Sequence, residues 1–285
     1  MRERSSTGRA TNGAETKEPA VGELLRRWRN HRRRSQLDVA LDAEVSQRHL
    51  SFVESGRAAP SRSLLLRLVR ELEVPLREQN RLLVAGGFAP VYRERSLDDP
   101  DLAAARRAVE RVLAAHEPHP ALAVDRHWNQ IFANRAVTPL LAGAAEHLLQ
   151  PPINVLRFTL HPEGLAPRIL NYRACRGHLL RRLRAQIDHW PDSGLLDLLT
   201  ELESYPPPPG AAPAPAAVPS DPSPESLGGI ALLMEIESEA GPLRFLTTTT
   251  VFGSPYDVLL SELAIESFFP ADDATAAVMR AAVEP

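Results

Sequence analysis

Apolar residues recur every three or four positions through residues 22–87, with arginines and other polar residues between them. This spacing predicts amphipathic helices, and its repeated interruption predicts several short helices packed into one compact unit. The apolar positions are Leu24, Leu25 and Trp28, then Leu37, Ala40 and Leu41, then Val45, Leu50 and Val53, and finally Leu64, Leu65, Leu68 and Leu72.

The stretch SQLDVALDAEVSQRHLSFVESG contains the pair Ser-Gln twice. Ser35 and Ser46 each stand just before an apolar stripe, where an N-cap residue belongs. Gly56 is expected to end the second of these helices, and Pro60 with Ser61 to start the next. Two helices of about eight residues, joined by a turn of about three, predict a helix-turn-helix. The turn carries Glu44 where glycine is common, and glutamate can adopt a left-handed backbone there at some cost.

In a helix-turn-helix, the second helix enters the major groove of DNA by its N-terminal end. Gln47 and Arg48 stand at that end, and their side chains can bond adenine and guanine bidentately. Gln36 is expected over a phosphate, as are Arg57 and Arg62. The arginines of RRWRNHRRR lie on several helical faces, so most are expected in solvent or with their stems on the surface. The candidate DNA-binding residues are Gln36, Ser46, Gln47, Arg48, His49, Ser51, Phe52, Arg57 and Arg62.

Residues 22–87 resemble the DNA-binding domains of the Xre/Cro-repressor type through SQLDVALDAEVSQRHLSFVESGRAAPS, which includes Glu54, Gly56 and Pro60. The resemblance implies an all-α, lambda-repressor-like domain of five helices over residues 21–87 that binds double-stranded operator DNA. The competing interpretation is a plain helical bundle with a basic face. Residues 1–20 are polar and lack the apolar region of a secretory signal, so we expect a disordered arm.

Glycines at 86 and 87, followed by prolines and charges, predict a linker over residues 88–100 and a second domain over 101–280. The segment PPPPGAAPAPAAVPSDPSPES, residues 206–226, is expected to be a flexible insertion. We expect a helix with Ala105, Val109, Val112 and Leu113 on one side, then strands at 121–124 and 130–133 and a helix capped by Asn134. A short helix or turn in NVLRFTLHPEGL, a long amphipathic helix bearing Leu170, Leu179, Leu180, Leu183 and Ile187, and a helix in SGLLDLLTELESY should follow. After the insertion, we expect a hairpin of GIALLMEIES and LRFLTTTTVFG around EAGP, and a third strand or strand-rich segment in VLLSELAIESFFP.

This succession of small strand pairs, helices and an antiparallel hairpin indicates an α+β domain of the PAS-like kind. The segments HPALAVDRHWNQIFANRAVTPLL, NVLRFTLHPEGLAPRILNY and TTTTVFGSPYDVLLSELAIESFFPAD resemble the MmyB-like ligand-binding domain over most of residues 100–278. That resemblance implies an effector pocket and, because fatty acids are associated with the family, an apolar small molecule as the effector.

Aromatic residues of the second domain are candidates for lining such a pocket, although membership of an ordinary core is the commoner role. An acidic ligand would also need a cation or a hydrogen-bond donor, for which Arg157, Arg173 and His161 are available near apolar segments. The candidate ligand-binding residues are Trp128, Phe132, Arg157, Phe158, Phe245 and Phe252.

Enzymatic motifs are missing: the sequence has no Gly-x-Ser-x-Gly, P-loop, Gly-x-Gly-x-x-Gly or His-Glu-x-x-His. Cys175 and His178 stand three apart on a predicted helix and His116 and His119 share a loop, so the four could in principle hold a metal. That set matches no established ligand spacing, and we expect surface histidines and a small buried cysteine instead. We therefore expect neither an enzyme, a cofactor nor a metal site.

Of the 285 residues, 33 are basic and 36 acidic, which gives a net charge of −3. The charge is unevenly divided: residues 1–87 hold 17 basic and 11 acidic side chains, net +6, and the rest of the chain has net −9. A basic head on an acidic body suggests that the head alone meets a polyanion. The single cysteine, and the absence of about 18 consecutive apolar residues, favour the cytoplasm over a membrane or an oxidising compartment.

Together these features predict a DNA-binding transcription regulator, acting as a homodimer, whose second domain senses an apolar or fatty-acid-like effector. The alternative is a DNA-tethered protein-interaction module, such as an antitoxin-like or scaffold protein, without a small-molecule ligand. An apolar pocket in the body would favour the first function and a flat apolar patch the second.

Overall fold

The computed structural model describes residues 19–95, 99–211, 232–251 and 257–281. The chain divides into two units, Met1–Val91 and Tyr92–Pro285, and the division falls inside the expected linker 88–100. The predicted arm over residues 1–20 and Phe252 fall wholly or almost wholly outside the described residues.

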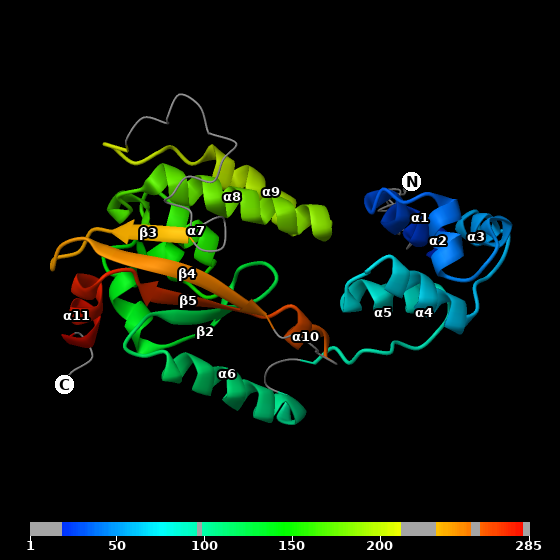
Figure 1. The fold of residues 1–285 in the computed structure, drawn as a ribbon, viewed down its shortest axis with the longest axis horizontal. Helices are drawn as coiled ribbons and strands as arrows, with labels where there is room; N and C mark the ends of the chain where they lie inside the picture. The colour runs from blue at the N-terminus through cyan, green and yellow to red at the C-terminus, as the bar shows by residue number, and fades with distance from the viewer. Residues whose placement is uncertain (1–18, 96–98, 212–231, 252–256, 282–285) are drawn as a thin grey trace, which may run out of the picture. The chain divides into compact units, whose positions relative to one another are not determined.

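The first unit is built of five helices around one apolar core, as predicted (Figure 1). Its fully buried side chains include Leu25, Leu50, Leu65 and Leu82, which come from four different helices. The helices are α1 (Val21–His31), α2 (Gln36–Asp42), α3 (Gln47–Glu54), α4 (Arg62–Glu71) and α5 (Leu76–Ala85).

The apolar stripe predicted on α2 is wrong in its phase. Leu37 and Leu41 are 50% and 66% exposed, whereas Val39 and Ala40 are buried. The buried face also carries Gln36, whose side chain bonds an acid on α3, so a polar contact between helices sets the rotation of α2. Sequence spacing alone fitted either face, because both have residues three and four apart.

The second unit is an α+β domain with one antiparallel sheet of five strands, in the order β2-β1-β5-β4-β3. The strands are β1 (Ala121–Val124), β2 (Gln130–Ala133), β3 (Leu232–Ile236), β4 (Leu243–Val251) and β5 (Ala264–Pro270). The helices are η1 (Pro100–Leu102), α6 (Ala103–Ala115), η2 (Arg135–Leu141), η3 (Glu146–Leu148), α7 (Val155–Leu160), η4 (Ala166–Arg168), α8 (Tyr172–His189), α9 (Ser193–Ser204), α10 (Val258–Ser261) and α11 (Asp273–Ala281). The predicted fold class, a helical domain followed by an α+β domain, is confirmed.

Helices cover both faces of this sheet, with α8 and α9 on one side and α6 on the other (Figure 1). Successive side chains of a strand point to opposite faces, and β1 follows this rule. Leu122 and Val124 belong to the large core with α8 and α9, whereas Ala121 and Ala123 join the small core under α6. Strand β1 is therefore buried on both faces, and the first two strands fall where the sequence placed them.

Two local predictions in this unit, one of a strand and one of a helix cap, are corrected. The segment expected as one strand begins with helix α10, because the carboxylate of Asp257 accepts a hydrogen bond from the amide of Leu259 and caps a helical turn. Asn134 does not cap a helix with its side chain. Its amide instead donates to the carbonyls of Leu113 and His119 and fixes the ends of α6 and β1.

Two side chains expected in an apolar face are exposed: Val112 on α6 at 51%, and Leu170, which precedes α8, at 47%. The expected insertion 206–226 lies outside the described residues from residue 212 onward, but its first part packs on the body. There Pro208 is buried and Ala211 contacts the large core.

Within the residues that the structure describes, no helix has the length and hydropathy needed to cross a bilayer.

Candidate nucleic-acid interface and ligand-binding residues

Both helices of the predicted helix-turn-helix begin at a serine cap. The hydroxyl of Ser35 accepts a hydrogen bond from the amide of Asp38, whose carboxylate reaches back to form a capping box. The hydroxyl of Ser46 accepts from the amide of His49 at 3.1 Å, without an acid to complete a box. The repeated Ser-Gln pair therefore marks two helix starts, as predicted.

The turn between α2 and α3 takes the strained form expected of its sequence. Glu44 has a φ of 53°, in the left-handed region that glycine usually occupies. The amide of Val45 then donates to the carbonyl of Ala40 at 2.9 Å, which closes the turn and satisfies a free carbonyl at the end of α2.

Helix α3 presents one polar face to solvent and buries the other. Gln47, Arg48 and His49 are exposed, Ser51 and Phe52 are half-buried, and the opposite face is in the core. Five of the nine candidate DNA-binding residues thus share one exposed face, and a sixth, Ser46, caps the helix that carries them.

Two arginines flank the half-buried ring of Phe52. The guanidinium carbon of Arg48 lies 5.3 Å from the ring centre, and that of Arg57, from the turn after α3, lies 5.9 Å from it. Arg62 is exposed at the first position of α4. Among the described residues, no acidic side chain pairs with any of these three guanidinium groups. All three side chains are exposed to solvent.

A buried ion pair joins the inner face of α3 to α1. Arg29 on α1 donates from Nε to Glu54 Oε1 at 2.6 Å and from Nη2 to Oε2 at 2.9 Å. The exposed fractions of the two side chains are only 12% and 3%. Gln36 adds a third bond, from its amide nitrogen to Glu54 Oε2 at 2.8 Å. One carboxylate thus joins α1, α2 and α3.

This arrangement changes the picture of Gln36, which was expected over a phosphate. One hydrogen of its amide nitrogen is used inside the protein, which leaves the second for DNA. The arginine run is also less solvated than expected. Arg32 donates to the carbonyls of Leu72 and Glu73 at the end of α4, and Arg34 pairs with Asp42.

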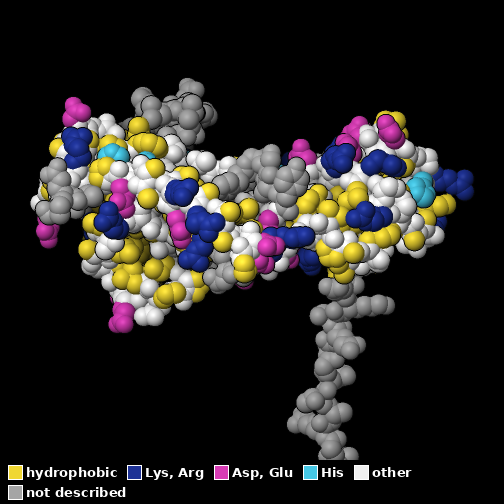
Figure 2. Space-filling model, turned by 90° about the horizontal axis from the view of Figure 1, so that it is seen from below, with side chains coloured by type: hydrophobic (Ala, Val, Ile, Leu, Met, Phe, Trp, Pro, Cys, Tyr) yellow, Lys and Arg dark blue, Asp and Glu magenta, His cyan; other side chains and the backbone are white. Residues whose placement is uncertain are grey.

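Basic side chains lie across the first unit among apolar and acidic ones, on the face of the molecule that Figure 2 shows. The net charge of the head is therefore a poor guide to its DNA surface. A better guide is which arginines have an acidic or carbonyl partner, because the partnered ones are already committed to the fold.

In the second unit, the candidate aromatic residues separate between the two faces of the sheet. Trp128, Phe158 and Phe245 are all buried in the large core, 5%, 6% and 0% exposed. Phe132 lies on the other face, where the guanidinium of Arg106 covers its ring at 5.4 Å. The structure therefore brings three of the six candidates into one apolar cluster.

A polar cluster that the sequence did not predict adjoins this core. Arg182 on α8 makes two bonds to Glu266 on β5, at 2.7 and 3.1 Å, and Thr249 on β4 donates to the same carboxylate. The guanidinium carbon of Arg182 also lies 4.4 Å from the ring centre of Trp128. The indole N–H of Trp128 donates to Gln186 at 2.8 Å. Charged groups therefore stand beside the aromatic residues, between α8 and the sheet.

The residues predicted to bind an acidic ligand, Arg157, Arg173 and His161, are not part of the Arg182–Glu266 cluster. Arg157 on α7 makes a bidentate pair with Glu201 on α9, at 2.6 and 2.7 Å. Hydrogen bonds from Arg157 outweigh burial and lower the pKa of Glu201, to which Tyr205 also donates. Arg173 is exposed, and His161 is half-buried with its ring edge-to-face against Tyr205.

The four residues considered as a metal set do not converge. Cys175 is buried, its Sγ donates to Asn171 Oδ1, and burial raises the pKa of the thiol to about 12. His116 bonds the carbonyl of Phe268 through Nε2. Among the described residues, the potential metal ligands that do lie close together are His147, His161 and Glu163.

Comparisons with known proteins assign both units. Residues 105–282 match the family described as MmyB-like transcription regulator ligand binding domain, and residues 25–79 match the family described as helix-turn-helix. No curated protein matches the sequence.

One solved structure, "Structure of an RNA-binding Light-Oxygen-Voltage Receptor", is 14% identical and aligns over 92% of this chain. The chain spans 61% of that protein's length, and the TM-score of 0.24 is too low to carry an argument.

Proposed function

We propose, because the chain belongs to the MmyB-like transcription regulator family, that helix α3 reads an operator sequence while the second unit binds an apolar, fatty-acid-like effector. The helix-turn-helix and the ligand-binding domain make the chain a DNA-binding transcription regulator with a ligand-binding domain. The operator-reading residues, the chemistry of the effector and action as a homodimer are the proposal.

The observation that carries the DNA-reading role is the exposed N-terminal turn of α3. Gln47 and Arg48 are exposed there, on a helix whose other face is locked by the Arg29–Glu54 pair. Preorganisation matters because a base-reading side chain must reach the groove in a fixed register. Arg57, which lies over Phe52 after the end of α3, and Arg62, at the start of α4, have no acidic partner in the described part of the chain, which supports phosphate contacts.

The test of base reading is a binding selection against a randomised operator. Replacing Gln47 or Arg48 by alanine should weaken specific binding by about 1–3 kcal/mol and relax the preference at one or two base positions. Arg27→Ala is the matched control, because Arg27 is an exposed arginine of α1 paired with Glu23. An unchanged sequence preference in both α3 variants would exclude the base-reading role.

Phosphate contacts give a different signature, which separates them from base reading. Arg62→Gln should weaken binding to all DNA sequences about equally and lower the salt slope by roughly one. The same measurement on Arg34→Gln should leave the slope unchanged, because Arg34 is engaged by Asp42. A loss confined to particular base positions would instead place Arg62 among the base readers.

For the second unit, the support is an apolar core with charge at its margin. Trp128, Phe158 and Phe245 lie in the large core, and Arg182 stacks on the indole of Trp128 while pairing with Glu266. Binding sites for small molecules combine apolar walls with a few placed polar groups. The guanidinium of Arg182 could bind the carboxylate of an amphiphile. Arg157, which the sequence suggested for this role, is the second candidate.

The effector is tested by pairing ligands that differ only in charge. Fatty acids and their methyl esters are titrated onto the full chain, with the melting temperature and the operator affinity measured together. An acid should raise the melting temperature more than its ester, and the difference should fall in Arg182→Gln if that cation binds the carboxylate. An effector regulates only if it binds the DNA-competent and incompetent states unequally, with a typical coupling of about 1–3 kcal/mol.

Native mass measurement of the same samples tests the homodimer, whose two copies would grip half-sites about 34 Å apart. Co-purification of a protein partner, with no amphiphile bound, would favour the DNA-tethered interaction module instead.

A further inference from the structure

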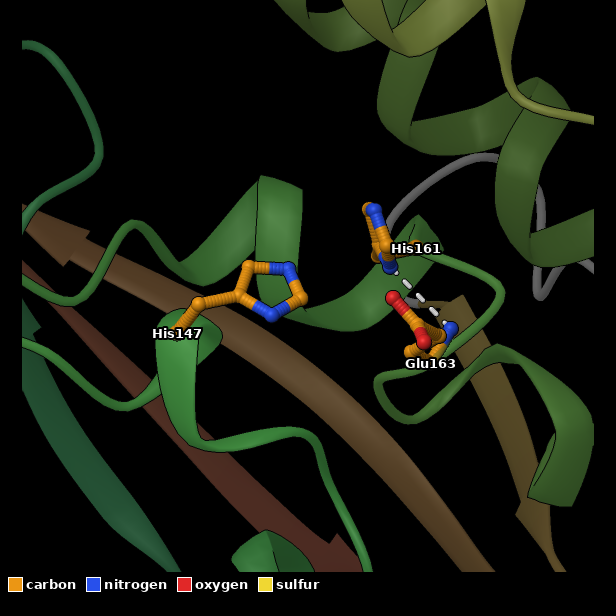
Figure 3. Close-up of side chains that lie close together, drawn as sticks. All are labelled: His147, His161 and Glu163. Carbon is orange, nitrogen blue, oxygen red and sulfur yellow. Dashed lines mark hydrogen bonds between the residues drawn. The ribbon is translucent and has the colours of Figure 1, made fainter.

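Three potential metal ligands come together on the second unit, in η3 and in the turn after α7. His147 belongs to η3, and His161 and Glu163 belong to the turn that follows α7 (Figure 3). One ligand atom from each residue lies within 4.8 Å of those from the other two. The two imidazole rings meet edge-to-face, with their centres 5.4 Å apart.

The backbone holds these two turns side by side. The amide of Ala145, just before η3, donates to the carbonyl of Glu163 at 2.9 Å. Gly164 packs so closely on α7 that an added Cβ would lie 2.2 Å from the carbonyl oxygen of Phe158. Leu148, next to His147, is buried in the large core. The ligands therefore project from anchored backbone, although His147 and Glu163 are themselves exposed.

We propose that His147, His161 and Glu163 bind one divalent transition-metal ion of the zinc class, with water in the remaining coordination position. Two imidazoles and one carboxylate suit zinc and its neighbours, whereas magnesium and calcium prefer oxygen ligands alone. Three protein ligands with one open position form an exchangeable site, unlike the closed four-ligand sites that serve folding. This site would give the protein a second input that differs in chemistry from an apolar effector.

Loading the site requires a small closure. With zinc–ligand distances of about 2.0–2.2 Å, neighbouring ligand atoms around a tetrahedral ion lie roughly 3.4 Å apart. The exposed side chains of His147 and Glu163 can supply this movement by rotation. The amide of Glu163 now donates to Nδ1 of His161 at 3.0 Å, and an ion bound at Nδ1 would replace that donor. The amide lies in an exposed residue, where water can take over the lost bond.

The neighbours of the trio define what the ion would reach. The ring of His161 packs edge-to-face on Tyr205, 4.9 Å between centres, and Tyr205 donates to Glu201 at the end of α9. Glu201 in turn pairs with Arg157 of α7. An ion held by His161 would therefore fix the position of a ring that contacts the C-terminal end of α9, while the carboxylate of Glu201 offsets part of its charge.

The test is a competition titration of the untagged full-length chain, stripped of metal, with Zn²⁺ against a chromophoric chelator. His147→Ala and Glu163→Gln should each weaken zinc binding by about 10-fold or more, the scale expected when a ligand shell is damaged. Two matched controls should stay within about twofold of the parent chain. Glu146→Gln removes an exposed carboxylate next to His147, and His189→Ala removes an exposed imidazole at the end of α8.

Titrations with Co²⁺ and Mg²⁺ test whether the site has the ligand preference of a transition-metal site. Co²⁺ should give visible absorption bands in the parent chain that His147→Ala removes, and Mg²⁺ in large excess should not displace it. Both ligand variants should keep the metal-free melting temperature, because their side chains are exposed. Zinc affinity that is equal in the parent chain and both ligand variants would overturn the proposal, as would a loss of binding confined to His189→Ala.

Discussion

Replacing Glu54 by glutamine should destabilise the first unit strongly, although the substitution conserves size and shape. Oε2 of Glu54 accepts from Arg29 and from Gln36, at 2.9 and 2.8 Å, and Oε1 accepts a second bond from Arg29. A glutamine offers one acceptor oxygen, so its amide nitrogen would face donors. The variant also leaves Arg29 as a buried cation whose side chain is 12% exposed.

Removing one partner of a buried ion pair costs about 3–5 kcal/mol, because the remaining charge is left uncompensated in a region of low dielectric. A helical unit of about 70 residues has a total stability of about 4–10 kcal/mol. Glu54→Gln should therefore remove roughly half of the free energy of unfolding of this unit. Helix α3 should lose order with it, because the pair supplements the apolar packing between α3 and α1 with charged hydrogen bonds.

The assay is hydrogen exchange in a urea series, read by mass spectrometry on peptides from each unit of the full chain. Peptides of the first unit should show a midpoint shifted to lower urea, and peptides of the second unit should be unchanged. Glu23→Gln is the matched control, because Glu23 pairs with Arg27 on the exposed face of α1, with side chains 54% and 63% exposed. Such a surface pair is worth about 0–1 kcal/mol. Equal losses in the two variants would refute the structural role given to Glu54.

Three further predictions concern caps, close packing and acid stability. Ser46→Ala should cost the first unit about 1 kcal/mol, measured by urea denaturation, because α3 loses its N-cap. Gly22→Ala should cost about 1–3 kcal/mol by the same measurement, since the new Cβ would lie 2.2 Å from the carbonyl oxygen of Val53; unchanged stability would mean that α1 shifts freely. Arg157 lowers the pKa of Glu201, so Glu201 stabilises the fold above its unfolded pKa of about 4.3, and this contribution is lost as pH falls through the lower folded pKa. Glu201→Gln should remove that part of the acid dependence of unfolding, and an unaltered pH profile would contradict it.

The features that the sequence predicted correctly are those set by neighbouring residues. The caps at Ser35 and Ser46, the left-handed turn at Glu44 and the strands at 121–124 and 130–133 depend on side chains within a few positions of one another. Side-chain capping, turn chemistry and strand alternation are local effects, so a linear pattern suffices to predict them.

The missed features depend on residues that meet only in the folded chain. The buried face of α2 follows from the bond between Gln36 and Glu54, and Arg182 meets Glu266 across 84 positions of sequence. His147 and His161 meet because a backbone bond joins their two turns, which no spacing of histidines reveals. The aromatic candidates likewise divide between the two faces of the sheet, because Phe132 points to the face under α6 whereas the others pack in the large core.

Some arginines of the first unit bond to other groups of the protein, whereas others have no acidic partner among the described residues. Arg29 and Arg34 pair with the carboxylates of Glu54 and Asp42, and Arg32 donates to the backbone carbonyl of Leu72. These three guanidinium groups are therefore held within the fold. Arg48 and Arg57 instead flank Phe52 without an acidic partner in the described residues. Phosphate binding gains from each cation that is not already paired, so Arg48 and Arg57 should contribute more to the proposed DNA contact than Arg29, Arg32 and Arg34. The net charge of the unit sets its long-range attraction to DNA. The hydrogen-bond partners of each arginine indicate which side chains remain for the proposed phosphate contacts.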